Sequence, residues 1–413
     1  MLLRKDAERI MNDAIAAVLP EKAVQDALAS FSLPAKGEGR VLLVAIGKAA
    51  WRMAKAAADT LGHRMERGLV VTKYGHSQGA LPRIEIIEAG HPVLDKNSCF
   101  GAQKALELVA DLSEQDVVLF LVSGGGSAVF EQPLVPLEEL SDLTSRLLRS
   151  GASITEINTI RKRLSAVKGG RFGQACAPAR VFSIILSDIL GDPLDMIASG
   201  PAAVDTSTCA QALDIVQRYD LRLSKRAQEL LTIETPKALP HVTSVVSGSV
   251  RALCRAAEDS CRALGYTPVT LADSVDCQAR ELGAVLAAIA RRHQDASGSL
   301  AFLMGGETVV KVLGEGKGGR NQEVALAVAQ GLAGCRDTAV FSFGSDGTDG
   351  PTDAAGGFAD EHTHQRLLEK GIHIADVLAR NDAYPALQAV DGLLMTGPTG
   401  TNVNDLSIVL IRR

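Results

Sequence analysis

The sequence has few aromatic residues, no long apolar run and no excess of positive charge. Aromatic side chains make up 4% of the 413 residues, with one Trp. Ala, Leu and Val must therefore supply the core, as is usual where helices pack on a parallel sheet. No stretch approaches the roughly 18 apolar residues of a membrane span, which excludes a membrane protein. The net charge of −5 argues against nucleic acid as a partner, because proteins that bind it usually carry a basic excess.

The sequence also lacks paired cysteines and a signal peptide. The seven cysteines are scattered, and none lies in a Cys-x-x-Cys pair. An odd number at wide spacing favours free thiols in a reducing compartment. Residues 1–20 carry charges within their apolar pattern, which predicts an amphipathic helix and not a leader. We therefore predict a cytoplasmic protein, and the composition leaves self-association into a homo-oligomer open.

Short apolar runs of strand length alternate with helical patterns in both halves of the chain. This alternation predicts two α/β domains with mostly parallel sheets. Residues 232–241 (TIETPKALPH) contain two prolines and no helical pattern, so they are the best linker candidate. We predict a larger, Rossmann-like three-layer domain over residues 1–237 and a smaller α/β domain over residues 238–413.

Three apolar runs end in glycine-rich loops that carry polar groups. They lie at residues 119–128 (LFLVSGGGSA), 302–323 (FLMGGETVVKVLGEGKGGRNQE) and 341–357 (FSFGSDGTDGPTDAAGG). Such runs predict buried strands whose tips reach the surface, and ligands of open α/β sheets bind at those tips. Glycine also lets backbone N–H groups approach an anion closely. The pattern predicts an enzyme that handles a phosphorylated ligand.

The first candidate group combines a lysine with a run of glycines. Lys48 follows the strand predicted at residues 41–46 and can reach an anion held at the next helix N-terminus. The loop after the strand at 117–122 offers backbone donors and two hydroxyls for a phosphate or carboxylate, from Ser123, Gly124, Gly125, Gly126 and Ser127. It is not a Walker A loop, because no GKS or GKT follows. A solvated lysine and a plain flexible turn are the alternative interpretations.

Acidic residues follow a second predicted strand, at residues 181–186. Asp188 is the first acid beyond it, and Asp192 and Asp195 lie further along the same loop. Carboxylates at a strand tip are the expected ligands of Mg²⁺ beside phosphates, or a base acting on an alcohol. We predict Asp188 and Asp192 as metal ligands and Asp188 as a catalytic residue, although Asp-Pro turns also arise for conformational reasons alone.

Residues 302–323 contain a formal GxGxxG, in a loop expected between a hairpin of residues 300–304 with 308–313 and a helix. The polar and glycine candidates are Glu307, Gly314, Gly316, Lys317, Gly319 and Arg320. A lone GxGxxG is a weak dinucleotide signal. The loop cations and the upstream acid have no part in that fingerprint, and they suit phosphoryl transfer better.

Two further polar segments complete the candidates. GSDGTDG at residues 344–350 contains Asp346, and TGPTGTNVND at residues 396–405 contains Asn402 and Asn404. We interpret them as groups around a substrate or metal. Purely conformational turns are the alternative for both segments.

Taken together, these segments resemble the glycerate 2-kinase family with a leucine-rich C-terminal module. The resemblance is carried by VAIGKAA, AGHPVLD, LVSGGGSA, EINTIRKRLSAVKGGR, LSDILGDPLDMIASGP, GGETVVKVLGEGKGGRNQE, SFGSDGTDGPTDAAGG and TGPTGTNVNDL. It implies conversion of D-glycerate and ATP to 2-phosphoglycerate and ADP, with the active site in an interdomain cleft; Mg²⁺ as cofactor is the separate expectation from Asp188 and Asp192. The family's polar site positions fall on Lys48, Asp188, Glu307, Arg320 and either Asn402 or Asn404.

Two rival functions stay open. Members of this family have also been labelled hydroxypyruvate reductases, and an NAD(P)H-dependent reductase would use the single GxGxxG. No acid lies in a short strand about 20 residues beyond Gly314, where the dinucleotide fold places one. A non-catalytic regulator that binds a phosphometabolite is the third hypothesis. Unpaired carboxylates beside a phosphate site argue against it, because binding alone rarely needs them.

Overall fold

The computed structural model describes residues 2–35 and 37–413 and divides into two compact units. The first unit is Ala23–Ser247, and the second joins the residues up to Lys22 with Gly248–Arg413. This division differs from the predicted boundary at residue 237. Strand β6 (Val242–Gly248) extends the sheet of the first unit, and helix α1 (Leu2–Ala17) belongs to the second.

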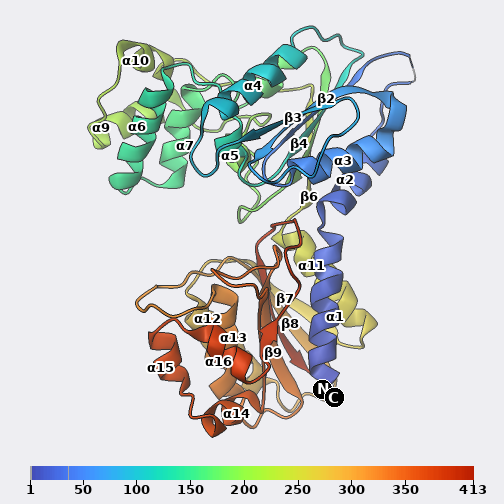
Figure 1. Ribbon diagram of the computed structural model, residues 1–413, viewed down its shortest axis with the longest axis vertical. Helices are drawn as coiled ribbons and strands as arrows, with labels where there is room; N and C mark the ends of the chain where they lie inside the picture. Colours follow the sequence, from blue (N-terminus) through green and yellow to red (C-terminus); the bar gives the residue numbers. More distant parts are fainter. Residues whose placement is uncertain (1, 36) are drawn as a thin grey trace. The chain divides into compact units, whose positions relative to one another are not determined.

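The sheet of the first unit has the strand order β3-β2-β1-β4-β5-β6 (Figure 1). Its strands are β1 (Val41–Ile46), β2 (Met65–Lys73), β3 (Ile84–Ala89), β4 (Val117–Val122), β5 (Arg180–Leu186) and β6. Strands β1, β2, β3, β4 and β5 pair in parallel, which confirms the predicted parallel sheet. Ile46 lies opposite Val122, so β1 and β4 end side by side and their loops start together.

Helices cover both faces of this sheet, which makes three layers. One core cluster joins the sheet to α2 (Pro20–Ala29) and α3 (Ala50–Leu61), and another joins it to α4 (Lys96–Leu108), α5 (Gly126–Val129) and α8 (Arg171–Ala175). A separate helical cluster has its own apolar core (Figure 1). It consists of α6 (Leu137–Arg149), α7 (Ile154–Arg163), α9 (Cys209–Arg218) and α10 (Lys225–Leu231).

The sheet of the second unit has the order β11-β10-β9-β12-β8-β7. Its strands are β7 (Thr267–Val275), β8 (Leu300–Gly306), β9 (Thr338–Gly344), β10 (Gly356–Asp360), β11 (Leu393–Leu394) and β12 (Asp405–Ile411). Only β7 and β8 pair in parallel, and the other four pairings are antiparallel. The prediction of a mostly parallel sheet is therefore wrong here.

The reason lies in where the last strand enters the sheet. Strands β7, β8 and β9 run in one direction, because helices α12 (Ala279–Arg292) and α13 (Arg320–Leu332) connect them as crossovers. Strand β12 enters between β8 and β9 in the opposite direction. The predicted hairpin of residues 300–304 with 308–313 is also wrong, because β7 and β12 occupy both edges of β8.

Helices α1 and α11 (Val250–Ala263) lie on one face of this sheet, and α12 and α13 lie on the other (Figure 1). The shorter helices are α14 (Thr363–Glu369), α15 (Ile374–Ala379) and α16 (Ala383–Ala389). The amphipathic pattern of α1 buries Asp6, which accepts a 2.6 Å hydrogen bond from the Tyr266 hydroxyl. The N-terminal helix thus belongs to the C-terminal unit.

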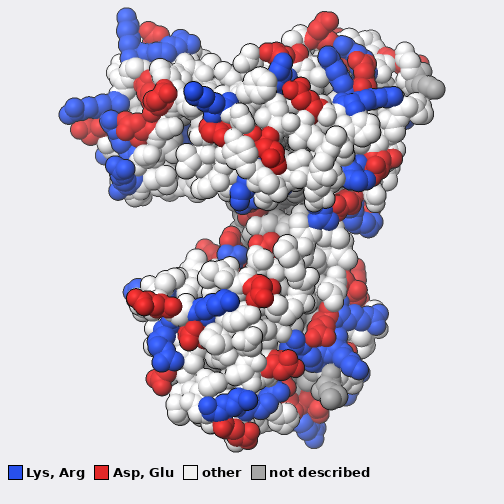
Figure 2. All heavy atoms as spheres, viewed as in Figure 1, with Lys and Arg blue, Asp and Glu red and all other residues white. Residues whose placement is uncertain are grey.

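Charged side chains of both signs are intermixed on the face of each unit that Figure 2 shows. Within residues 2–35 and 37–413, no helix combines the length and the apolar character that crossing a membrane requires.

Candidate functional site

The turn after β1 and the loop after β4 are hydrogen-bonded to each other. The Lys48 N–H donates to the Gly124 carbonyl (2.9 Å), and the Ala49 N–H donates to the Ser123 hydroxyl (3.0 Å). Gly47 has φ +107°, and a Cβ there would lie 2.3 Å from the Ser123 carbonyl oxygen. Only glycine permits this approach, which fixes Lys48 beside the glycine run.

Three polar side chains lie against the glycine run. A Cβ on Gly124 would lie 2.0 Å from a carboxylate oxygen of Asp188, and one on Gly125 would lie 3.1 Å from both Lys48 Cγ and His91 Cδ2. The structure therefore brings Lys48, Asp188 and the glycine run together. A side chain at Gly124 or Gly125 would displace those groups.

The loop after β5 supplies the predicted metal ligands. Asp192 has φ +53°, and its Oδ1 is buried with no hydrogen-bond partner among the described residues. An oxygen in that state is available to a cation, so the donor set fits Mg²⁺. In the described ranges, no three His, Cys, Asp or Glu side chains form a complete metal cluster. Such a cation would complete its shell with phosphate oxygens and water, as Mg²⁺ commonly does.

His91 is a residue of this array that the candidate residues omit. Burial lowers the pKa of its imidazole, and the charges of Lys48, Lys73 and His76 lower it further. The ring is therefore neutral at pH 7 and can donate one hydrogen bond and accept another. The only indication of His91 in the sequence is the AGHPVLD motif, which contributes to the family resemblance. The motif itself does not indicate that His91 packs against Gly125, which lies far along the chain.

Buried cations support the glycine run from behind. The carbonyl oxygen of Ser127 accepts hydrogen bonds from Arg161 (3.0 Å) and Lys168 (2.9 Å), and both cations pair with the buried Glu131. Burial lowers the pKa of Lys168 to about 8. The Ser127 hydroxyl bonds to that of Ser199 at 3.0 Å. This side of the loop is therefore held by the protein itself.

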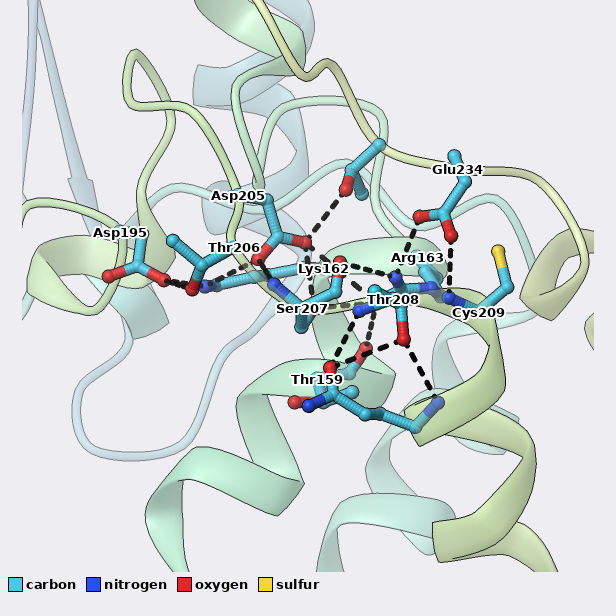
Figure 3. Close-up of polar contacts among 12 residues, drawn as sticks. Thr159, Lys162, Arg163, Asp195, Asp205, Thr206, Ser207, Thr208, Cys209 and Glu234 are labelled. Atoms are coloured by element: carbon cyan, nitrogen blue, oxygen red, sulfur yellow. Dashed lines mark hydrogen bonds and ion pairs between the residues drawn. The ribbon is translucent and has the colours of Figure 1, made fainter.

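A second buried network fixes the far end of the aspartate loop (Figure 3). Lys162 is 2% exposed and reaches Asp195 (3.2 Å) and Asp205 (3.1 Å). Its neighbour Arg163 pairs with Glu234 at 3.1 Å. Asp195 is thus paired with α7, whereas Asp192 keeps one buried carboxylate oxygen without a partner among the described residues.

The second unit carries its own charged array at the start of α13. Arg320 donates to Glu307 (2.6 Å) and to both carboxylate oxygens of Asp405 (2.5 and 3.0 Å). Burial raises the pKa of Asp405 to about 7, the charge of Asp349 adds to this effect, and Arg320 opposes it. The sequence predicted Arg320 and Glu307 as site residues, and it offered Asp405 only as one polar group of the segment at residues 396–405.

Asp349 caps α13. Its carboxylate accepts from the backbone N–H groups of Asn321 (3.1 Å) and Gln322 (2.8 Å). A Cβ on Gly319 would lie 2.2 Å from Asp349 Cγ, so Gly319 makes room for the cap. Two of the helix N-terminal donors are therefore already used, and burial raises the pKa of Asp349 to about 6.

A cavity of 580 Å³ opens beside this array. Its lining includes Gly316, Gly319, Arg320 and Asp346, all of them predicted site residues. Lys317 is not among the lining residues. Its ammonium lies 4.1 Å from the centre of the Tyr384 ring, and the side chain is exposed.

The GxGxxG loop does not have the structure that a dinucleotide fingerprint requires. Residues 308–319 form no strand, although Val309 makes one isolated bridge to Gln278. The N–H of Gly316 donates to the Arg380 carbonyl (2.9 Å), and a Cβ on Gly314 would lie 2.3 Å from the same oxygen. The glycines pack this loop against another loop.

The two candidate asparagines have different environments. Asn402 is exposed, whereas Asn404 is 3% exposed and has φ +68°. Its carbonyl accepts from the Ser345 N–H at 3.1 Å, but its side-chain Nδ2 has no partner within the described part of the chain. An orphaned buried donor favours Asn404 over Asn402 as a ligand contact.

Known proteins match this chain over nearly its whole length. A family model described as a domain of unknown function, DUF4147, matches residues 6–232, and the MOFRL family model matches residues 300–405. The D-glycerate 2-kinase of Thermotoga maritima is 49% identical over 99% of this chain and 98% of its own length. A crystal structure of glycerate kinase from the same organism covers 99% of both chains with a TM-score of 0.94.

A protein of Agrobacterium vitis that carries hydroxypyruvate reductase only as a provisional name is 38% identical over 99% of this chain and 94% of its own length. The fold, the charged strand ends and these relatives together define a two-domain α/β phosphotransferase. Full-length identity well above 30% settles which one: the chain belongs to the glycerate 2-kinase family.

Proposed function

We propose that this protein transfers the terminal phosphoryl group of ATP to the 2-hydroxyl of D-glycerate, giving 2-phosphoglycerate and ADP. The observation that carries the proposal is the array of Lys48, Asp188 and the glycine run at the adjoining ends of β1 and β4. It combines a cation, a carboxylate and backbone donors, which are the groups that phosphoryl transfer requires.

Lys48 neutralises charge on the transferred phosphoryl oxygens. No ion pair of its ammonium occurs among the contacts of residues 2–35 and 37–413, so its full charge is available to an anion. Asp188 lies against Gly124 and accepts the proton that leaves the 2-hydroxyl, or holds the cation. The backbone N–H groups of the glycine run bind carboxylate or phosphate oxygens.

Mg²⁺ would be held by Asp188 and Asp192, since the buried Oδ1 of Asp192 lacks a protein partner. Bound there, it would supply charge neutralisation to the phosphate chain. Asp195, further along the same loop, pairs with Lys162 at 3.2 Å and so fixes that end of the loop.

Arg320 provides a second, pre-oriented cation. Asp405 holds the guanidinium from one side, and Glu307 accepts from its outer nitrogen. The two terminal nitrogens of the guanidinium can each donate to a phosphoryl oxygen when the ligand displaces Glu307.

The predicted cytoplasmic location is supported by the cysteines, because all seven are free thiols.

The test is a phosphorus NMR spectrum of the product formed from ATP, Mg²⁺ and D-glycerate. We expect a single phosphomonoester that is 2-phosphoglycerate. A spectrum of 3-phosphoglycerate would contradict the regiochemistry, and no phosphate ester would contradict the reaction. The reductase alternative is checked in parallel, because loss of nicotinamide absorbance with hydroxypyruvate would identify it.

A further inference from the structure

The cavity of the second unit lies where ligands of α/β sheets bind. Strands β8 and β9 run in the same direction and end at Gly306 and Gly344, so their carboxyl ends share one edge of the sheet. The cavity, of 580 Å³, opens at the start of α13 and has a size common among small-molecule sites. Its volume is far larger than a small hydroxy acid needs.

One wall of this cavity is apolar and exposed. Val309 and Val312 line it with 53% and 73% of their surface exposed, and Val310 lies between them. Val310 packs against the core of this unit, whereas Val309 and Val312 lie in no helix or strand whose apolar face would explain their exposure. Exposed apolar groups gathered at a cavity are typical of a wall that contacts a ligand.

Other lining residues are acidic. They are Glu323, Asp346 and Asp349, of which Glu323 pairs with Arg280 at 3.0 Å, and the lining cation Arg320 pairs with Glu307 and Asp405. Hydroxyl groups of a ligand would find acceptors among these carboxylates. Asp346 accepts only from the Thr348 N–H (3.0 Å) among the described contacts of its side chain, so it keeps acceptor capacity.

Thr308 supplies an independent observation. It lines the cavity and is 6% exposed, and its hydroxyl has no hydrogen-bond partner among the residues that the structure describes. A buried hydroxyl without a partner is uncommon in a native protein, because the missing hydrogen bond destabilises the folded state. A ligand in this cavity would satisfy it.

We infer that this cavity binds the nucleoside part of the nucleotide: the base contacts the Val309–Val312 wall, Asp346 accepts from a ribose hydroxyl, and the phosphates extend toward Arg320. The inference rests on the proposed function for the identity of the nucleotide as ATP. It assigns the adenosine to the second unit.

The experiment compares Val309→Glu with Val285→Glu. Val285 lies on α12, is 47% exposed and does not line the cavity, so it is a matched control for the same change. ADP binding is measured by calorimetry on the full chain, and KM is measured for ATP and for D-glycerate. We expect Val309→Glu to weaken ADP binding and raise the ATP KM by about tenfold or more, because it places a charge against an apolar base.

The control should change each constant by less than about twofold. If Val309→Glu leaves ADP binding unchanged, or raises the KM of D-glycerate alone, the inference is overturned even when the parent is an active kinase. If the parent binds ADP with the expected pattern but does not phosphorylate glycerate, only the proposed function fails. A parent that does not bind ADP contradicts both.

A second comparison tests the ribose contact. The parent should prefer ATP to 2′- or 3′-deoxy-ATP by about tenfold in KM for one of the two analogues, and Asp346→Asn should reduce that preference to about twofold. Equal preference in the parent and in Asp346→Asn would overturn the role of Asp346. The preference ratio separates this contact from a general loss of folding, which would affect all nucleotides alike.

Discussion

The two charged arrays differ in how their cations are compensated. Lys48 has no carboxylate partner within the described residues, whereas Arg320 lies between Glu307 and Asp405. Glu307 is 44% exposed and Asp405 is 7% exposed, so a ligand can replace the first partner but not the second. The second array therefore fixes the orientation of its cation more firmly than the first.

The difference follows from the two sheets. In the parallel sheet of the first unit, β1 and β4 end opposite each other, and glycine loops leave the lysine projecting beside them. In the mixed sheet, β12 runs against β8 and β9, so its first residue, Asp405, reaches the carboxyl ends of both strands. An antiparallel strand thus delivers a buried carboxylate to a place where a purely parallel sheet has only loops.

The largest effect is expected for Lys48→Ala. Loss of an uncompensated cation should lower kcat/KM with D-glycerate and ATP by about 10³-fold, as for other groups that stabilise transition-state charge. Lys48→Arg should recover part of the loss because it keeps the charge. The control is Lys55→Ala on α3, an exposed lysine paired with Asp59. Steady-state rates within about threefold of the parent for Lys48→Ala would remove Lys48 from the mechanism.

Arg320→Ala should have a smaller effect, of about 10²-fold on kcat, because its charge is already balanced by carboxylates. Arg320→Lys should recover little, since a lysine cannot hold Asp405 and a phosphoryl group with one fork. The double variant with Lys48→Ala tests whether the two arrays serve one reaction. A loss clearly below the product of the single losses indicates that they do, whereas fully independent losses would count against a shared step.

His91→Gln should lower kcat/KM by about tenfold, which is a typical size for the loss of one hydrogen bond to a reacting group. The neutral ring lies beside Lys48 and Gly125, where it can contact the phosphoryl oxygens that Lys48 is proposed to bind. The matched control is His362→Gln, whose side chain is 74% exposed. Equal rates in the two variants would show that His91 only fills space.

These residues also show what the sequence could and could not predict. Lys48, Asp188 and the glycine run were found because each directly follows an apolar strand, and parallel strands bring such ends together. His91 follows β3, and its place above Gly125 depends on the path of the loop after that strand, which no local pattern specifies. The charge of Lys317 in a glycine-rich loop suggests a phosphate contact, but its side chain packs on Tyr384, because the GxGxxG loop folds against residues 380–382.

The antiparallel pairings of the second sheet could not be predicted from the sequence for a similar reason. Alternation of strands and helices predicts direction only for strands that a helical crossover connects, as it does for β7, β8 and β9. The last strand has no helix after it, so its direction and its place between β8 and β9 depend on which edge is left unpaired. The role of Asp405 depends on that placement, and therefore it could not be predicted either.

The smallest effect concerns stability and pH in the second array. Burial raises the pKa of Asp349 from 3.8 to about 6, so the folded protein holds a proton that the unfolded chain releases. Stability must then fall as the pH rises from about 4 to about 6, because the unfolded chain binds fewer protons in that range. Asp349→Asn removes this titration and keeps one of the two capping hydrogen bonds. The lost bond gives a constant offset of about 1 kcal/mol at every pH.

Urea unfolding at pH 5 and pH 7.5 isolates the titration from that offset. The raised pKa of Asp349, about 6, lies about one unit above pH 5. Between pH 5 and pH 7.5 the free energy of unfolding of the parent should therefore fall by about 1.4 kcal/mol more than that of Asp349→Asn. Asp295→Asn, an exposed control, should follow the parent. An equal pH dependence in Asp349→Asn and the parent would mean that Asp349 is ionised throughout. The carboxylate that caps α13 would then add a full negative charge beside Arg320 across the whole range, and the second array would be more acidic than its burial implies.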